Sequence, residues 1–294
     1  MVDNYAEPLS GLDRYAVVGN PIAHSKSPII HEAFAKQTQQ NISYERVLAP
    51  LDGFSATVKD LVNKGYKGVN VTVPFKFEAY NLASELRSHA LDAGAANTLL
   101  FNSKGIVADN TDGAGLVRDL LAQGIALHSA RILLLGAGGA ARGVIGPLLQ
   151  QAPKCLVIAN RSNAKADELV KLFADLAAQH EVALESRTLA DLESGVITQY
   201  PFDLIINATA AGLSDESPIS SKAAANIFVP SSFAYDMVYG KTTAFMQQAL
   251  QKGARVSDGL GMLVEQAADA FLLWRGTNLA TAIDSRAVLA QLRS

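Results

Sequence analysis

The chain has 294 residues and a net charge of −3, and its length leaves room for two domains. Hydrophobic residues make up 49% of it and charged residues 18%, a balance typical of a folded protein and not of a disordered one. No run of Lys and Arg favours a polyanion, and no stretch of about 18 apolar residues favours a membrane span. We therefore expect neither a nucleic-acid partner nor a membrane partner.

The first half of the chain predicts strands and helices in alternation. Ser27 should cap a helix whose first position is Pro28, and Gly65 should end another helix. The segments 97–101 and 105–108 predict a hairpin. The other expected elements are strands at 15–19, 44–48 and 68–73, and helices at 54–62, about 77–86 and about 115–123.

Residues 70–76, with the sequence NVTVPFK, alternate like a strand and end in a lysine. Val71 and Val73 should point to one face and the polar residues to the other. A row of hydrogen-bonding side chains suits a small polyhydroxylated ligand, because each hydroxyl needs a partner once water is excluded. Residues 109–113, DNTDG, offer carboxylates that could meet the lysine. The alternative is an edge strand ended by Pro74, followed by a solvated lysine.

The second half begins with an apolar run at 131–135, typical of a buried parallel strand. The alternation of strand and helix that follows predicts a doubly wound sheet. Pro147 falls within the first helix, so we expect a bend or an early end there. Further strands are expected at 156–159, 182–186, 203–207 and 233–237, and helices at 164–179, 262–274 and 285–292, the last two packing back on the first half.

Residues 136–141, GAGGAA, match the fingerprint G-x-G-x-x-G/A with a strand before it and a helix after it. Gly136 permits a tight turn, Gly138 lets backbone N–H groups approach a pyrophosphate, and Ala141 lets the helix pack close to the strand. The alternative is a glycine-rich turn without a ligand. The predicted nucleotide contacts are Gly136, Ala137, Gly138, Gly139 and Ala140.

The next strand ends without the acidic residue that an NAD site usually places on the ribose 2′-hydroxyl. Asn160, Arg161, Ser162 and Lys165 stand there instead and offer two positive charges and a hydroxyl. Because Arg stacks on adenine and pairs with phosphate, this segment favours NADP over NAD. The alternative for Arg161 and Lys165 is an ordinary role as surface cations.

The single cysteine, Cys155, excludes an internal disulfide and lies in an apolar run, so we expect a buried strand residue. The five histidines have no metal-ligand spacing, and we assign no metal. Residues 1–8 lack the basic start and apolar core of an export signal. We therefore expect a cytoplasmic protein. Its sequence does not distinguish a monomer from a homodimer.

Several motifs in order resemble the shikimate dehydrogenase family over nearly the whole chain. They are SKSP at 25–28, NVTVPFK at 70–76, ANTL at 96–99, DNTDG at 109–113, the glycine-rich loop, NRS at 160–162 and DGLGMLVEQ at 258–266. The resemblance implies an N-terminal α/β substrate domain over 1–112 and 259–294, and a Rossmann-type NADP domain over 113–258. It also implies NADP-dependent interconversion of 3-dehydroshikimate and shikimate, a step of aromatic amino-acid biosynthesis.

The resemblance also implies roles for individual residues. Lys76 and Asp112 are the expected catalytic pair. The expected substrate contacts are Ser25 and Ser27 for the carboxylate, Thr72, Asn97 and Gln266 for ring hydroxyls, Asn70 as support of the pocket, and Tyr239 from the cofactor domain. Met237 and Gly259 should line the nicotinamide end of the cofactor site.

Other interpretations stay open on the sequence alone. Lys76 and Asp112 could form an ion pair that is only structural. Ser25 and Ser27 could form turns and helix caps, and Gln266 could lie at a domain boundary without a ligand. A quinate/shikimate dehydrogenase that uses NAD is a second functional class, and a non-catalytic NADP-binding sensor is a third. Glycines after Asp112 and Asp258 suggest hinges for domain closure.

Overall fold

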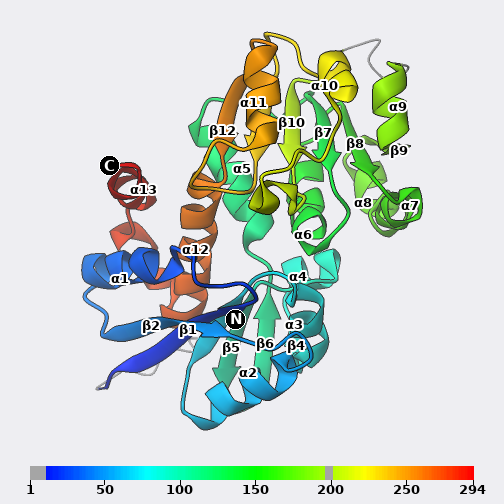
Figure 1. Ribbon diagram of the computed structural model, residues 1–294. Helices are drawn as coiled ribbons and strands as arrows, with labels where there is room; N and C mark the ends of the chain where they lie inside the picture. The colour runs from blue at the N-terminus through cyan, green and yellow to red at the C-terminus, as the bar shows by residue number, and fades with distance from the viewer. Residues whose placement is uncertain (1–10, 196–200) are drawn as a thin grey trace. The chain divides into compact units, whose positions relative to one another are not determined.

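The structure of the protein is a computed structural model that describes residues 11–195 and 201–294. The chain forms two compact units (Figure 1). Unit 1 comprises the chain up to Gly115 together with Leu263–Ser294, and unit 2 comprises Leu116–Met262. The sequence placed its domain boundaries at 112/113 and 258/259. The assignment of substrate to one domain and cofactor to the other stays a prediction.

Unit 1 is built on a six-stranded mixed sheet of order β2-β1-β3-β5-β6-β4. Its strands are β1 Asp13–Gly19, β2 Ile42–Leu48, β3 Gly68–Val71, β4 Glu85–Leu86, β5 Thr98–Asn102 and β6 Gly105–Asp109. β5 is antiparallel to both β3 and β6, while β1 is parallel to β2 and β3. The carboxyl ends of β1, β3 and β6 and the start of β5 therefore meet at one edge of the sheet.

Helices cover both faces of this sheet (Figure 1). They are α1 Ser27–Thr38, α2 Phe54–Asn63, α3 Lys76–Leu82, α4 Ser88–Ala93, the start of α5 Asp112–Ala122, most of α12 Leu260–Arg275, the short η3 Thr277–Ala282, and α13 Ser285–Arg293. Phe54 and Phe75 fill the core on one face. On the other face, Phe34 packs against Phe271 and Val288. The prediction that the C-terminal helices pack back on the first half is confirmed.

Unit 2 is a six-stranded, all-parallel sheet of order β12-β11-β10-β7-β8-β9 (Figure 1). Its strands are β7 Arg131–Leu135, β8 Cys155–Asn160, β9 Ala183–Thr188, β10 Leu204–Asn207, β11 Phe233–Asp236 and β12 Arg255–Asp258. Numbered from β7, this is the order 3-2-1-4-5-6 of a Rossmann fold, whose winding reverses between β7 and β10. The predicted doubly wound sheet is confirmed.

Apolar side chains form a core on each face of the unit 2 sheet. The helices are the rest of α5, then α6 Gly139–Leu149, α7 Asn163–Leu172, α8 Ala174–Gln179, α9 Leu189–Ser194, the short η2 Ala211–Ser214, α10 Ser221–Ile227 and α11 Ala244–Gln251. Ala141, Val144 and Leu148 of α6 lie in the core on one face, and Phe245 of α11 lies in the core on the other. Cys155 is buried in β8, as predicted.

The predicted cap of α1 is wrong in its residue. The helix begins at Ser27 itself, Lys26 occupies the N-cap position, and no side chain there accepts a capping bond. The Ser27 N–H instead donates to the Ser25 hydroxyl at 3.3 Å. The hydroxyl of Ser27 is therefore not used to cap the helix.

The prediction for the strand at 68–73 is wrong at its end. β3 stops at Val71, and the Phe75 N–H bonds back to the Thr72 carbonyl at 3.1 Å as the chain turns. Val73 is 36% exposed and does not share the buried face of Val71. Side chains alternate between the two faces of a sheet only within a strand. Beyond the turn that follows Val71, alternation in the sequence therefore does not predict which face a side chain occupies.

Two long helices were predicted where the chain breaks into shorter elements. The segment 77–86 is α3 followed by the two-residue strand β4, and 164–179 is α7 and α8 separated at Phe173. Pro147 stays within α6, which ends two residues later at Leu149. The hairpin of β5 and β6 is confirmed, with Asn102 paired to Gly105. In the described part of the chain, no helix combines the length and apolar character needed to cross a bilayer.

Candidate functional site

A buried ion pair lies at the convergent edge of the unit 1 sheet. Lys76 is the first residue of α3, after β3, and Asp112 is the first residue of α5, after β6. The Lys76 ammonium donates to Asp112 Oδ2, and the two residues are only 9% and 5% exposed. The parallel course of β3 and β6 brings these segments together, because both strands end at the same edge.

Asn97 orients the carboxylate of this pair. Its amide nitrogen donates to Asp112 Oδ1 at 2.9 Å, so each carboxylate oxygen has its own partner. The same nitrogen lies 2.9 Å from the Thr111 hydroxyl and 3.1 Å from Gln266 Oε1, on α12. The structure thus brings together Lys76, Asp112, Asn97 and Gln266, as expected from the sequence. Thr111, which was not predicted, belongs to the same cluster.

Two serine hydroxyls lie in the segment that follows β1. Ser25 Oγ donates to Ser27 Oγ at 3.2 Å, and both residues are buried. The Arg46 guanidinium donates to the Ser25 carbonyl at 2.8 Å and fixes this loop. Thr72 is half-buried at the same edge, where a side chain at Gly19 would lie 2.4 Å from its methyl group. Gly19 is therefore needed for the position of Thr72.

Asn70 differs from the other predicted contacts because the protein already fills its hydrogen-bonding capacity. Its amide oxygen accepts from Tyr44 at 2.8 Å and from His31 at 3.1 Å. Its nitrogen donates to the Asn97 carbonyl at 3.3 Å and to the Thr98 hydroxyl at 3.1 Å. An amide has two acceptor and two donor positions, so Asn70 supports the site from behind.

His31 is fully buried within an aromatic cluster. Its ring stacks on Tyr44 with a centroid distance of 4.3 Å and lies 5.2 Å from the ring of Trp274. Burial lowers the pKa of His31 to about 3, and its hydrogen bond to Asn70 only partly opposes that shift. The imidazole of the folded protein is therefore neutral at pH values well above 3. No motif pointed to His31 or Tyr44, since both contact Asn70 only through the tertiary fold.

In unit 2, the glycine-rich loop follows β7 at the point where the winding of the sheet reverses. Gly136 has φ +113°, and its N–H donates to the Ala159 carbonyl at 2.8 Å. A side chain at Gly136 would meet Thr209 and Ala208 at 3.1 and 3.2 Å, whereas one at Gly138 would meet no atom within 4 Å. Gly138 is the N-cap of α6, so open space lies before the amide groups of this helix.

The segment after β8 presents the predicted cationic group. Arg161, Ser162 and Lys165 are exposed, and within the described residues neither cation has an ion-pair partner. Asn160 donates to the Ser162 carbonyl at 3.0 Å and shapes the turn into α7. Two cations without an ion-pair partner, in the segment that follows the second strand of a nucleotide-binding sheet, suit an additional phosphate.

The segments after β11 and β12 contain the other predicted unit 2 residues. A side chain at Gly259 would lie 2.4 Å from the Met237 carbonyl, so these two segments touch. The buried Asp236 accepts from the Val238 N–H at 3.0 Å, and Asp258 accepts from the Gly240 N–H at 3.0 Å. Burial raises the pKa of Asp236, while bonds from Thr243, Val238 and Asn207 oppose the rise. These two carboxylates hold the loop that contains Tyr239.

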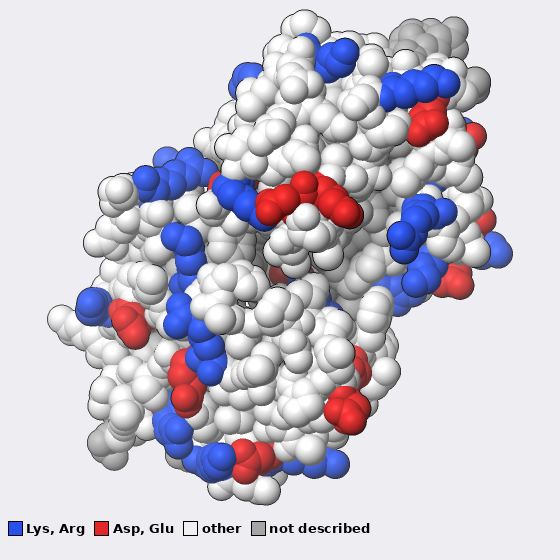
Figure 2. Space-filling model, viewed as in Figure 1, with Lys and Arg blue, Asp and Glu red and all other residues white. Residues whose placement is uncertain are grey.

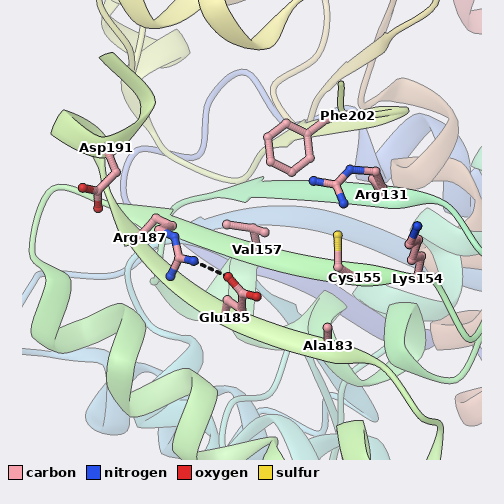
Figure 3. A pocket seen from close by; sticks show the side chains of 9 residues that line it. All are labelled: Arg131, Lys154, Cys155, Val157, Ala183, Glu185, Arg187, Asp191 and Phe202. Carbon is pink, nitrogen blue, oxygen red and sulfur yellow. Dashed lines mark hydrogen bonds and ion pairs between the residues drawn. The ribbon is translucent and has the colours of Figure 1, made fainter. Parts of the chain in front are cut away.

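A cavity of about 560 Å³ lies elsewhere in unit 2, over β7, β8 and β9 (Figure 3). Its charged groups are largely satisfied, because Arg187 pairs with Glu185 and the Arg131 guanidinium lies 5.6 Å from the centre of the Phe202 ring. None of the predicted site residues lines it. Cys155, on its floor, has a pKa that burial raises, so its thiol is a poor nucleophile there.

The described residues contain no group of three or more His, Cys, Asp or Glu side chains arranged to hold a metal ion. Lys and Arg side chains and Asp and Glu side chains are interspersed across the face drawn in Figure 2, in several places side by side. The polar groups that could act on a ligand are therefore those of the sheet edge in unit 1 and of the loops after β7, β8 and β11 in unit 2.

A parallel sheet of Rossmann order, with a glycine turn where its winding reverses, defines a dinucleotide-binding α/β protein. Its companion unit contains the buried pair of Lys76 and Asp112. Residues 17–99 match the family described as the shikimate dehydrogenase substrate binding domain. Residues 119–228 match the family described as shikimate / quinate 5-dehydrogenase. The chain belongs to the shikimate dehydrogenase family.

Relatives match the chain over nearly its whole length. The shikimate dehydrogenase (NADP(+)) of Herminiimonas arsenicoxydans is 54% identical over 284 residues, which cover 96% of this chain and 97% of that protein. Its counterpart from Methylobacillus flagellatus is 52% identical over 290 residues, covering 96% and 100%. The crystal structure of the Thermus thermophilus enzyme, in complex with NADP(H) and shikimate, is 31% identical with a TM-score of 0.80, covering 96% and 98%.

The glycine loop yields a prediction that separates folding from ligand binding. Gly138→Ala should leave the free energy of unfolding within about 0.5 kcal/mol of the parent, because its side chain meets no protein atom. It should weaken NADP binding about tenfold, since the added methyl group enters the space of the pyrophosphate. Calorimetric titration with NADP and thermal unfolding measure the two quantities.

Gly136→Ala is the matched control. Its positive φ and close neighbours should destabilise the protein by about 1–2 kcal/mol. Unchanged NADP affinity in Gly138→Ala would contradict the predicted role of this loop.

The burial of His31 predicts how stability depends on pH. The folded-state pKa of about 3 lies below the ordinary value of 6.5, so between these values only the unfolded chain takes up the proton. Stability is therefore lost as the pH falls from 6.5 towards 3 and is unaffected above 6.5. From about pH 6.5 to about pH 5, the parent should lose about 1.6 kcal/mol relative to His31→Gln.

Denaturant unfolding followed by fluorescence measures this difference in unit 1, because Trp274 is the single tryptophan of the chain. The comparison with His31→Gln removes the contributions of groups that both proteins share. Parallel stability curves for the two proteins over this pH range would show that His31 is accessible to protons in the folded state.

Proposed function

We propose that this protein catalyses the reversible, NADPH-dependent reduction of 3-dehydroshikimate to shikimate, in aromatic amino-acid biosynthesis. The observation that carries the proposal is the buried Lys76–Asp112 pair, which is oriented by Asn97 and surrounded by uncharged hydrogen-bonding groups. Such a cluster offers one mobile proton and several fixed partners for hydroxyl groups. Membership of the family supports the same reaction.

Reduction of a ketone requires a hydride at carbon and a proton at oxygen. NADPH, when bound, supplies the hydride. Lys76 Nζ gives its proton to the carbonyl oxygen in reduction and takes it back in oxidation. Asp112 holds the ammonium in place by its Oδ2, while Asn97 keeps Oδ1 from turning towards the lysine. The positive charge of the ammonium also stabilises the oxygen as negative charge develops on it.

The serine hydroxyls and amides recognise the substrate in this proposal. Ser25 and Ser27 donate to the carboxylate, and Thr72, Asn97 and Gln266 bind ring hydroxyls. The Asn97 amide already donates a hydrogen bond to Gln266 Oε1 at 3.1 Å. A ring hydroxyl that binds both residues would therefore replace this hydrogen bond. Tyr239, in the loop held by Asp236 and Asp258, is proposed as a further contact from unit 2.

The residues of unit 2 fit NADP on chemical grounds. Gly136, Ala137, Gly138, Gly139 and Ala140 place backbone amides at the start of α6, where a pyrophosphate is stabilised. Arg161 and Lys165, with Asn160 and Ser162 in the same turn, would bind the 2′-phosphate. Met237 and Gly259, which touch each other, would line the nicotinamide end.

A quinate/shikimate dehydrogenase that uses NAD and a non-catalytic NADP-binding sensor remain the two alternatives. The cationic turn after β8 favours NADP over NAD, and the intact Lys76–Asp112 pair favours an enzyme over a sensor. A spectrophotometric assay with shikimate or quinate and with each cofactor separates the three. Comparable rates for quinate with NAD would favour the first alternative, and no turnover with any pair the second.

The cytoplasmic location, the monomeric or dimeric state, the lack of nucleic-acid and membrane partners, and domain closure near residues 112–113 and 258–259 stay predictions. The location is expected from the lack of an export signal, the lack of these partners from composition, and closure from the positions of glycines.

Lys76→Ala should lower kcat by about 10²–10⁴-fold, the usual contribution of a positioned proton donor. The dissociation constant for shikimate should change far less, because the proposed substrate contacts are other side chains. Steady-state assays measure the change in kcat, and calorimetric titration with shikimate measures the change in the dissociation constant. Full turnover in a correctly folded Lys76→Ala protein would refute the role of Lys76.

Asp112→Asn keeps the shape of the side chain and removes its charge, so it tests how the lysine is held. We expect a large loss of kcat and a changed dependence of rate on pH. A pH profile identical to that of the parent would show that Asp112 and Lys76 do not act together.

Arg161→Ala should raise KM for NADPH about tenfold or more, because a charge-assisted bond to a phosphate is lost. KM for NADH should hardly change, since that cofactor lacks the 2′-phosphate. Lys171→Ala removes the same charge from the exposed far end of α7 and serves as the control. Equal effects of the two substitutions on NADPH would identify a long-range field instead of a specific contact.

A further inference from the structure

The orientation of the Asn70 amide is settled by one neighbour. The Asn97 carbonyl, 3.3 Å away, can only accept a hydrogen bond, so the Asn70 nitrogen must face it. A flipped amide would bring two oxygens together there. The Asn70 oxygen must therefore face Tyr44 and His31, and both of these must donate to it.

This requirement fixes the tautomer of His31. The proton lies on Nε2, which donates to Asn70, and Nδ1 keeps only a lone pair. Nδ1 is also the single buried side-chain nitrogen or oxygen in the described residues that has no hydrogen-bond partner. The opposite tautomer would leave a buried N–H without an acceptor and would direct a lone pair at the Asn70 oxygen, both unfavourable.

From Asn70, hydrogen bonds run towards the catalytic pair. The Asn70 nitrogen donates to the Thr98 hydroxyl at 3.1 Å, and Thr98 donates to the Asn97 side-chain oxygen at 2.9 Å. The Asn97 oxygen thus accepts from Thr98, and it also accepts from the Thr111 N–H at 2.9 Å, so its nitrogen faces Asp112 Oδ1. Thr98 carries the donor direction set at Asn70 to Asn97, and the Thr111 N–H supports the same orientation.

A second arm runs towards the serines. Tyr44 uses its proton on Asn70, so its oxygen keeps its lone pairs for the nearby Ser27 hydroxyl, and this neighbour opposes the burial-induced rise in the pKa of Tyr44. Ser25 in turn donates to Ser27 at 3.2 Å. When a carboxylate binds, the serine protons can turn to it without disturbing the bond from Tyr44 to Asn70.

We propose that His31, as the Nε2–H tautomer, acts with Tyr44 to lock the Asn70 amide, and that this lock positions both the serine hydroxyls and the Asn97–Asp112 contact. The inference rests on the function proposed above and deepens it. His31, Tyr44 and Asn70 are positioning residues in this scheme, because they act on the substrate only through other side chains.

Two substitutions of His31 separate hydrogen bonding from packing. His31→Gln can present an amide N–H where Nε2 stood, whereas His31→Phe keeps an aromatic ring against Tyr44 and Trp274 but has no donor. We expect His31→Phe to lower kcat/KM for shikimate about tenfold, with KM for NADP unchanged. His31→Gln should recover most of that loss, and the shape of its pH–rate profile should match that of the parent.

A role in packing alone predicts the opposite order, because phenylalanine preserves the aromatic stack and glutamine does not. His31→Phe with activity equal to or above that of His31→Gln would therefore overturn the proposal. Circular dichroism confirms that each variant is folded before the comparison is made.

Tyr44→Phe gives an independent test, since it deletes the second donor to Asn70 and keeps the aromatic ring beside His31. It should lower kcat/KM for shikimate by a similar factor. Combined with His31→Phe, it should reduce activity by less than the product of the single effects, because both act through one amide. Fully multiplicative effects would show that the two residues act separately.

The tautomer itself can be measured without activity, by nitrogen-15 NMR of the histidine side chains in the parent protein. A proton on Nδ1 of His31 would overturn the proposed lock whatever the protein catalyses. A proton on Nε2 in a protein that turns over neither shikimate nor quinate would support the lock and refute the proposed reaction, so the two failures are distinguishable.

Discussion

The site in unit 1 depends on the burial of one ion pair. Removing an ammonium and a carboxylate from water is expensive unless other groups satisfy them, and Asn97 provides the bond that Asp112 Oδ1 requires. Asn97 is in turn held by Thr98 and Thr111. The polar side chains at this edge of the sheet therefore depend on one another for their hydrogen bonds. The loss of any one of them leaves a buried polar group without its partner.

Unit 2 meets a different constraint, because its proposed contacts with the pyrophosphate are backbone groups and not side chains. The turn after β7 has a positive φ at Gly136, and the missing side chain at Gly138 leaves open space before α6. The loop after β8 adds two cations, Arg161 and Lys165. The loop after β11 is held by hydrogen bonds to the carboxylates of Asp236 and Asp258. Each lies at the carboxyl end of a parallel strand, where such sheets bind ligands.

Aromatic packing and polar positioning are combined behind the unit 1 site. His31 and Tyr44 stack on each other with a centroid distance of 4.3 Å, while each also donates to Asn70. The stack excludes water from the amide, which strengthens its hydrogen bonds and makes an error in their direction more costly. The aromatic core therefore serves both the stability of the unit and the geometry of the proposed catalytic groups.

The sequence by itself determined the doubly wound sheet, the glycine turn, and the hairpin of β5 and β6, because strand alternation, glycine turns and apolar runs are local patterns. It failed at the end of β3, at β4, at the break between α7 and α8, and at the cap of α1, because turns and short elements leave no periodic pattern and Ser27 lies inside its helix. Only the tertiary structure decided that Lys76 meets Asp112, that Thr111 joins them, and that His31 and Tyr44 orient Asn70. These contacts join residues distant in the chain, and their strength depends on burial and direction, which no local pattern contains.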